Sequence, residues 1–235
     1  MRRGRPPDCP ALGSPTGANM VNVPAGKACG AAMKLYSSKF APNPRRVRIF
    51  LSEKGLSVPT VDVDLVAFEH KAPGYAALNP FRRVPCLELD DGEILAESIA
   101  ICRYFEALHP SPSLFGEGAR GQAFVEMWQR RLELNLLANV AAVFRHSHPA
   151  MKEWEVPQIP DFAAASRPRA LEAMAIADRA LQGRAFIAGD QFSVADITGL
   201  VALDFAKPAR IDIPAELADL RRWHAALASR PSAKA

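Results

Sequence analysis

Apolar side chains in residues 33–109 recur with two different periods. Residues 60–65 alternate apolar and polar side chains, which is typical of a half-buried strand. Residues 44–54 place apolar side chains on one helical face before Gly55, which ends the predicted helix. The same patterns predict a strand at 34–37, a short helix at 70–78, paired strands at 86–89 and 93–95 around an Asp-Gly turn, and a helix at 98–108. These elements follow the order βαβαββα.

The pattern beyond residue 113 is helical throughout. Apolar side chains recur every three or four residues over 119–146, which predicts one long helix. Ser193 and Asp196 form a predicted capping box that opens an apolar helix. Two more helices are predicted over 163–181 and 214–227. We therefore expect four units: an N-terminal extension (1–32), an α/β domain (33–109), a linker (110–116) and an all-α helical domain (117–235).

Composition and charge narrow the function classes. The chain has 235 residues and no apolar run of about 18 residues, so a membrane span is not expected. Four basic residues against Asp8 place +3 of the net charge of +4 in residues 1–32, which leaves the remaining body nearly neutral. No basic stripe with interleaved aromatic side chains is present, and nucleic acid is therefore not an expected partner. The Pro- and Gly-rich composition of residues 1–32 predicts disorder.

The cysteines predict neither disulfides nor a metal site. Cys9, Cys29, Cys86 and Cys102 show no CxxC pair and no metal-ligand spacing. This pattern fits a protein of the reducing cytoplasm that holds no metal. Cys86 and Cys102 fall on an apolar strand and helix, where a thiol usually serves as a small buried hydrophobic group.

A candidate peptide site comes from two residue pairs. Val84-Pro85 precedes a strand, and a cis bond there would let Val84 offer its backbone N–H and C=O to an extended ligand. Ser98 begins the next helix, where free N–H groups bind a carboxylate, and Glu97 is suited to an amine. Both could instead simply cap the helix. Together the four residues predict a site for a small zwitterionic peptide.

Several motifs then resemble one protein family. In order and spacing, these segments are similar to the cytosolic glutathione transferases: residues 79–85 (NPFRRVP), 97–100 (ESIA), 189–196 (GDQFSVAD) and 221–223 (RRW). The resemblance covers residues 33–235. It implies a thioredoxin-like domain that binds glutathione, a helical domain that binds a hydrophobic electrophile, and a homodimer. It further implies that Val84 pairs with the cysteinyl backbone of glutathione and that Pro85, also among the glutathione-binding residues, shapes the fold.

The resemblance also suggests roles for the two ends of glutathione. It implies that Glu97 and Ser98 hold the γ-glutamyl end. It implies that Lys71, with His70 as a further candidate, meets the glycine carboxylate. Taken alone, Lys71 would be interpreted as a solvated surface charge.

The position that activates the thiol departs from the family pattern. Many members carry a Tyr, Ser, Thr or Cys after the first strand, and the aligned residue here is Ala41. The candidate replacement donors are Asn43, Ser38, Ser37 and an ordered water, although the three side chains are also typical turn residues. Arg45 is expected to add positive potential that favours a thiolate.

The second-substrate pocket is predicted on the long helix. Trp128 and Arg131 lie along it and Arg145 and His146 lie at its end, although helical spacing equally indicates core or dimer contacts. Cationic side chains at a helix end also complement the helix dipole. The expected activity is attack of a bound glutathione thiolate on a small electrophile. The alternatives are a non-catalytic glutathione- or partner-binding protein, suggested by Ala41, and a glutathione-dependent isomerase or dehalogenase.

Overall fold

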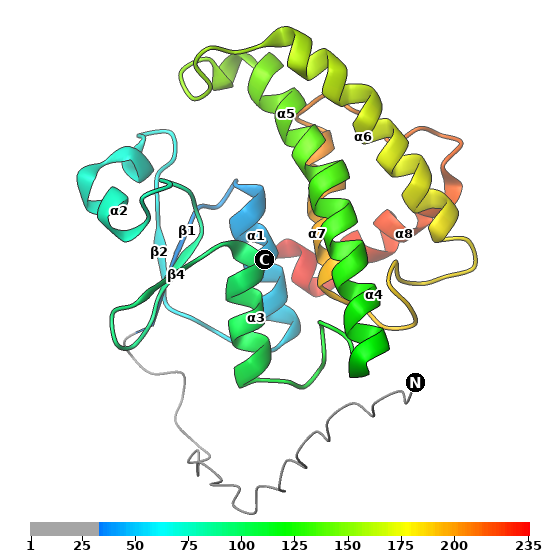
Figure 1. Cartoon of the computed structure of the whole chain (residues 1–235), viewed down its shortest axis with the longest axis horizontal. Coiled ribbons are helices and arrows are strands. Elements are labelled where there is room, and N and C mark those ends of the chain that lie inside the picture. The colour runs from blue at the N-terminus through cyan, green and yellow to red at the C-terminus, as the bar shows by residue number, and fades with distance from the viewer. Residues whose placement is uncertain (1–32) are drawn as a thin grey trace, which may run out of the picture.

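The computed structural model describes residues 33–235 and shows two parts side by side. A small sheet with its helices forms one part, and a set of longer helices forms the other (Figure 1). The extension predicted over residues 1–32 lies outside the described residues.

The first part contains a four-stranded mixed sheet with the order β2-β1-β3-β4. β1 is parallel to β2 and antiparallel to β3. β3 and β4 are antiparallel and form the predicted hairpin. The strands are β1 (Lys34–Ser37), β2 (Thr60–Asp62), β3 (Cys86–Glu88) and β4 (Ile94–Ala96). This thioredoxin-like arrangement confirms the predicted α/β fold class.

The strand expected over 60–65 ends early for a local reason. The Asp64 carboxylate accepts hydrogen bonds from the backbone N–H groups of Val66 (2.8 Å) and Ala67 (3.0 Å). The Asp64 backbone N–H in turn donates to the Glu69 carboxylate at 2.7 Å. The last backbone hydrogen bond to β1 is therefore the one that the Val63 N–H donates to Ser37, and the strand does not continue to residue 65.

Three helices complete this part, and the short helix predicted over 70–78 is divided at the extended Ala72 into a helical turn and a helix. α1 and α3 pack against one another between the sheet and the second part, whereas α2 lies at the outer edge (Figure 1). The elements are α1 (Pro42–Glu53), the 3₁₀ turn η1 (Glu69–Lys71), α2 (Pro73–Leu78) and α3 (Ser98–Leu108).

The helical part confirms the predicted all-α class. The long helix expected over 119–146 is continuous but has a π-helical segment in its middle. It comprises α4 (Gly118–Arg131), the π segment η2 (Leu132–Leu137) and α5 (Ala138–Ser147). The other elements are η3 (Pro149–Met151), α6 (Pro160–Ala180), α7 (Val194–Ala206), α8 (Ala218–Ala228) and η4 (Pro231–Lys234).

A buried carboxylate fixes the start of α7. Asp196 accepts hydrogen bonds from the backbone N–H of Ser193 (2.9 Å), from its hydroxyl (2.9 Å), and from the backbone N–H of Ile187 (3.0 Å). The Trp223 indole of α8 donates to the same carboxylate at 3.0 Å. The predicted capping box is therefore present, and it also ties α8 to α7.

The last helix begins later than its apolar pattern predicts. The expected start was Pro214, whereas α8 begins at Ala218. Asp178 of α6 accepts a hydrogen bond from the backbone N–H of Leu220 (2.8 Å), which satisfies one of the free donors of the first turn. The helix start is thus set by a contact with α6, which the local sequence does not show.

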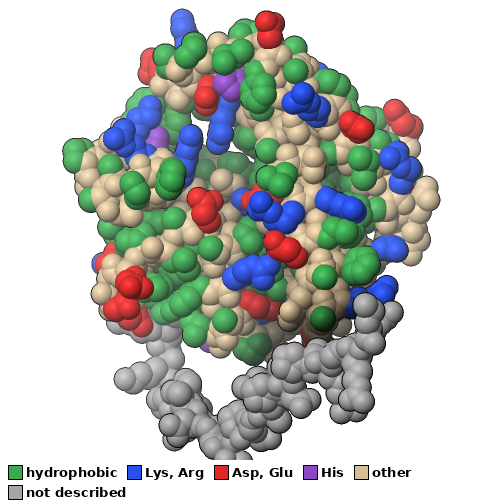
Figure 2. Space-filling view, viewed as in Figure 1, with side chains coloured by type: hydrophobic (Ala, Val, Ile, Leu, Met, Phe, Trp, Pro, Cys, Tyr) green, Lys and Arg blue, Asp and Glu red, His purple; other side chains and the backbone are tan. Residues whose placement is uncertain are grey.

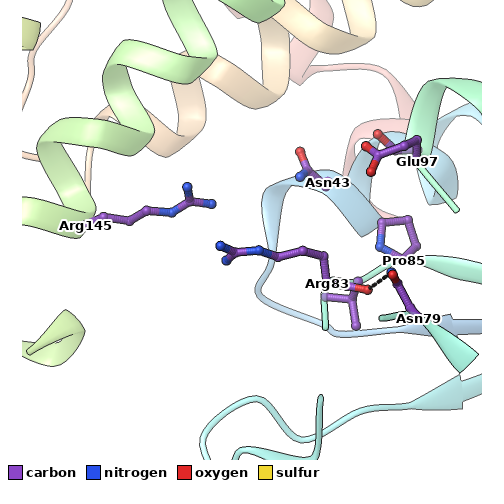
Figure 3. A pocket seen from close by; sticks show the side chains of 8 residues that line it. Asn43, Asn79, Arg83, Pro85, Glu97 and Arg145 are labelled. Carbon is purple, nitrogen blue, oxygen red and sulfur yellow. Dashed lines mark hydrogen bonds between the residues drawn. The ribbon is translucent and has the colours of Figure 1, made fainter. Parts of the chain in front are cut away.

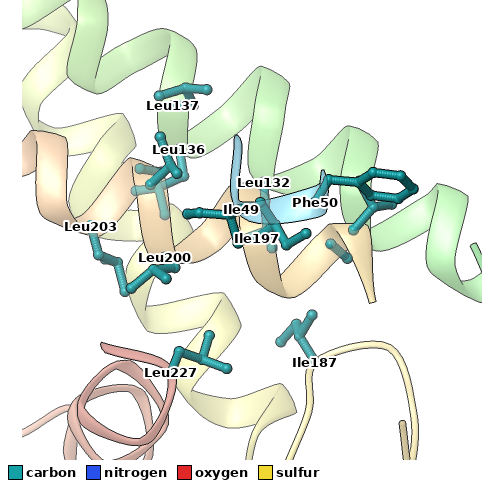
Figure 4. Close-up of a cluster of buried hydrophobic side chains, with 14 of the residues drawn as sticks. Ile49, Phe50, Leu132, Leu136, Leu137, Ile187, Ile197, Leu200, Leu203 and Leu227 are labelled. Carbon is teal, nitrogen blue, oxygen red and sulfur yellow. The ribbon is translucent and has the colours of Figure 1, made fainter. Parts of the chain in front are cut away.

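One hydrophobic core spans both parts. Ile49 and Phe50 of α1 are fully buried and belong to the same cluster as the apolar side chains of η2, α7 and α8 (Figure 4). The shared core holds α1, whose first turn borders the candidate site, in a fixed position against the helical part.

Candidate functional site

A pocket lies where the sheet part faces α5. It has a volume of about 150 Å³. Seven of its lining residues come from the sheet part and one comes from α5 (Figure 3). The lining residues are Asn43, Asn79, Arg83, Val84, Pro85, Glu97, Ser98 and Arg145. The pocket therefore brings together both residue pairs that the sequence singled out.

Two side chains hold the loop that presents Val84. The Asn79 amide and the Tyr75 hydroxyl each donate a hydrogen bond of 2.8 Å to the carbonyl of Arg83. The next peptide bond, Val84–Pro85, is cis, as the sequence allowed. This loop is thus anchored immediately before the residue proposed to pair with a peptide.

Glu97 and Ser98 form the opposite side of the pocket. Ser98 is the first residue of α3 and is buried, so a free N-terminal N–H group of that helix lies at the pocket. Glu97 has φ +70°, a conformation that non-glycine residues rarely adopt and that is concentrated at functional sites. In Figure 3 its carboxylate points toward Asn43. This end of the pocket therefore offers an acceptor for an amine beside donors for a carboxylate.

Asn43 is positioned by Arg46. The Arg46 guanidinium donates a hydrogen bond of 2.9 Å to the Asn43 side-chain carbonyl oxygen. Because the oxygen of the amide is held in this way, its NH₂ group is the end left for a ligand. Pro42 and Pro44 carry no N–H, so Asn43 also supplies the free backbone donor at the positive end of α1.

Arg46 is in turn held by the helical part. Its side chain is buried, and it donates a hydrogen bond of 2.7 Å to Glu133 in the π segment. Arg130 (2.8 Å) and Gln129 (3.3 Å) also donate to the Glu133 carboxylate. The orientation of Asn43 therefore depends on a residue of the other part of the molecule.

The other candidates for thiol activation lie elsewhere. The Ser37 hydroxyl accepts a hydrogen bond of 3.0 Å from Arg48, and Ser38 is buried outside the residues that line the pocket. Arg45 donates to Asp204 of α7 at 2.6 Å and to the carbonyl of Ala233 at 2.9 Å. Its charge is therefore paired within the protein, and the expected contribution of Arg45 to a thiolate is not supported by this geometry.

His70 and Lys71 lie near the pocket but do not line it. The His70 ring stacks on Trp154 with 4.6 Å between ring centroids, and Lys71 lies over the Phe68 ring at 4.4 Å. Burial lowers the pKa of His70, and the charges of Lys71 and Arg83 lower it further. Their contact with the glycine end of glutathione stays a prediction.

Of the four residues predicted for the second substrate, Arg145 is the one in the pocket lining. Trp128 is buried in the shared core, with the exposed Arg131 over its ring at 5.0 Å. His146 accepts a hydrogen bond of 3.2 Å from the backbone N–H of Ile159 and thereby holds the loop before α6. The apolar spacing that suggested Trp128 thus reflects the core.

Sequence reasoning missed Asn79 and Arg83 as lining residues. Both stand within the NPFRRVP segment, whose Asn-Pro turn was the available signal for Asn79. It also missed Arg46. Arg45 and Arg46 are adjacent on one helix and differ only in the direction their side chains point, which the sequence alone does not show.

The part of the chain that the structure describes, residues 33–235, contains no cluster of three or more His, Cys, Asp or Glu side chains placed to hold a metal ion. No helix of the same range is long and apolar enough to cross a membrane.

Comparisons with known proteins agree with this geometry. Residues 40–108 match the family model of the glutathione S-transferase N-terminal domain, and residues 160–231 match that of the C-terminal domain. Glutathione S-transferase 2 of Saccharomyces cerevisiae is 39% identical over 205 residues, which cover 86% of this chain and 88% of the yeast protein. Maleylacetoacetate isomerase of Pseudomonas aeruginosa is 45% identical over 84 residues, which cover 35% of this chain and 40% of that enzyme.

A solved structure shows the same fold. A glutathione S-transferase domain-containing protein of Marinobacter aquaeolei superposes with a TM-score of 0.82 at 40% identity, covering 85% of this chain and 98% of its own. With both domain models matched in order and close relatives aligned over most of its length, the chain belongs to the glutathione S-transferase family and is a glutathione transferase.

Proposed function

We propose that glutathione lies along the pocket between Val84 and Ser98 and that Asn43 stabilises its thiolate. The observation that carries this proposal is the presence of Val84, Glu97, Ser98 and Asn43 in the lining of one pocket. Val84 would pair with the cysteinyl backbone as an added strand does. Ser98 would hold the α-carboxylate at the start of α3, and Glu97 would meet the α-amine.

Asn43 supports thiol activation without a hydroxyl at position 41. A thiol with a pKa of about 8.5 needs a fall of about two pKa units to be mostly ionised at neutral pH, which is about 2.7 kcal/mol. One hydrogen bond to a charged group contributes about 1.5–3 kcal/mol. The Asn43 side-chain amide, oriented by Arg46, is therefore sufficient in magnitude, and its backbone N–H adds to it.

The test is conjugation of glutathione to 1-chloro-2,4-dinitrobenzene by wild type and by Ala41→Ser. An existing donor predicts clear activity in wild type and a change of less than about threefold on adding the hydroxyl. A non-catalytic glutathione-binding protein predicts near-zero activity that rises strongly in the variant. The second result would overturn the assignment of Asn43.

A second candidate reaction is glutathione-dependent isomerisation. The similarity to a protein named maleylacetoacetate isomerase, which is confined to 84 residues, favours this candidate over dehalogenation. Isomerisation returns glutathione unchanged, whereas conjugation consumes it. Measuring free thiol during turnover of maleylacetoacetate therefore separates the two reactions.

The domain boundaries, the assembly and the compartment extend this proposal. We assign glutathione binding to residues 33–109, a linker to 110–116 and the second substrate to 117–235, in line with the two matched domain models. We also propose a homodimer, in which the partner subunit would cover exposed apolar residues such as Phe81, which is 79% exposed. The buried thiols of Cys86 and Cys102, which form no disulfide, fit a cytoplasmic location.

A further inference from the structure

Two guanidinium groups face each other across the pocket. Arg83 precedes Val84 in the sheet part, and Arg145 lies in the last turn of α5. Figure 3 shows the two side chains extended toward one another from opposite sides. Within residues 33–235, neither guanidinium has a hydrogen bond or an ion pair to another side chain or to the backbone. Unpaired arginine side chains that converge on one space form a site for an anion.

The surroundings of these arginines are mainly cationic. His70 of η1 lies close enough to Arg83 to feel its charge, since Arg83 lowers the pKa of His70, as burial and the neighbouring Lys71 also do. Burial lowers the pKa of Arg145 and the charge of Arg83 lowers it further, whereas Glu155 raises it. Figure 2 shows the blue Lys and Arg side chains gathered around a hollow between the α2 region and the far end of α5.

The acidic side chains nearby do not neutralise this pair. Glu155 lies 3.9 Å from the His146 ring, and Glu97 is at the α3 end of the pocket. The two arginines therefore repel one another, and an anionic group bound between them would relieve that repulsion.

The position of Arg145 identifies which ligand carries the anion. In the proposed binding mode Ser98 already takes the γ-glutamyl carboxylate, and the sheet part supplies every other glutathione contact. Arg145 is the one lining residue from the helical part, which is the side that faces the second substrate. The predicted hydrophobic electrophile would meet a cation at this point.

We propose that Arg83 and Arg145 together bind the carboxylate of an acidic electrophile, so that the enzyme favours anionic over neutral second substrates. This inference rests on the proposed glutathione site. The same chemistry is available in the glycine carboxylate of glutathione itself, so the test has to separate the two sources.

Two product analogues provide that test without turnover. S-(4-carboxybenzyl)glutathione and S-(4-carbamoylbenzyl)glutathione differ only in the charge of the group that occupies the electrophile position. Calorimetry on the full chain gives the dissociation constants of both conjugates and of glutathione. The proposal predicts that wild type binds the carboxy conjugate about 10- to 100-fold more tightly than the carbamoyl conjugate.

The variants locate the preference. Arg145→Gln and Arg83→Gln are each expected to reduce the ratio of the two dissociation constants about tenfold or more. Arg169→Gln, which changes an exposed arginine of α6, is the matched control and is expected to keep the wild-type ratio.

Three results would overturn the proposal. If wild type binds both conjugates equally, no carboxylate site exists there. If Arg145→Gln weakens glutathione and both conjugates by the same factor, the arginine holds the glycine carboxylate instead. If wild type binds neither glutathione nor the conjugates, the proposed glutathione site itself is wrong, and this inference falls with it.

Discussion

Arg46 donates a hydrogen bond of 2.9 Å to the Asn43 side-chain oxygen and so turns the Asn43 NH₂ group toward the pocket. Arg46 is anchored by Glu133 in the helical part. The donor proposed for thiol activation therefore stands on the sheet part but is oriented from the helical part. This relationship explains how a chain with alanine at position 41 keeps a rigid donor at the start of α1.

Asn43→Ala removes this donor. We expect kcat/KM for conjugation at neutral pH to fall about 10- to 100-fold, because one hydrogen bond to a charged group is lost. Glutathione affinity measured below pH 6, where the thiol is protonated, should change little. If Ser38→Ala produces this loss and Asn43→Ala does not, the donor is Ser38.

Glu133→Gln tests the anchor of Arg46. It leaves the buried Arg46 guanidinium without its carboxylate partner, so we expect the free energy of unfolding to fall by about 2–4 kcal/mol. Glu126→Gln is the matched control, since it breaks the exposed pair with Arg103 and should cost less than about 1 kcal/mol. Urea denaturation of both variants gives the comparison, and equal losses would refute a special role for the Arg46 pair.

Adjacent arginines show what the sequence could not resolve. Arg45 and Arg46 stand side by side on α1, and the sequence favoured Arg45 as the residue that acts on the thiolate. One helical step of about 100° directs Arg45 to Asp204 and Arg46 to Glu133 and Asn43. Which of the two reaches the site depends on partners that are distant in the sequence. Asp204 is 159 positions from Arg45, and Glu133 is 87 positions from Arg46.

Local chemistry made other features predictable. Val84-Pro85 and Glu97-Ser98 were found because a proline before a strand and a polar helix start have local signatures. The order of elements followed from the apolar period together with turn and cap residues such as Gly55 and Ser193. Trp128 was misleading because the same helical spacing describes a core position and a pocket position.

Gly199→Ala tests the packing of α7 on α8. A Cβ atom at this position would lie 2.2 Å from the Trp223 indole, which is fully buried. Overpacking of this kind costs about 1–3 kcal/mol, or more when the ring cannot move. Gly74→Ala in α2 has no atom within 4 Å of its added Cβ and should be neutral or slightly stabilising. Thermal denaturation distinguishes the two, and a neutral Gly199→Ala would contradict the packing.

The ionisation of Asp204 makes the free energy of unfolding depend on pH in the acid range. Burial alone would raise the pKa of its carboxyl, but hydrogen bonds from His224 and Arg45 outweigh burial and lower the pKa. Because the pKa in the folded state is lowered, the contribution of Asp204 to stability is present above the pKa of the unfolded chain, about 3.9, and is lost as the pH falls through the folded-state value. Asp204→Asn should therefore reduce the free energy of unfolding at pH 7 and flatten its decline below pH 4. An unchanged pH profile in urea titrations would contradict this assignment.

The most direct test of the account is the ultraviolet absorbance of the glutathione thiolate bound to the protein, followed from pH 5 to pH 9. Wild type should show a bound thiol with a pKa about two units below the ordinary value of about 8.5, and Asn43→Ala should return it by about one to two units. A bound thiol that titrates like free glutathione in wild type, or a lowered pKa that Asn43→Ala leaves in place, would contradict the central claim that Asn43 stabilises the thiolate.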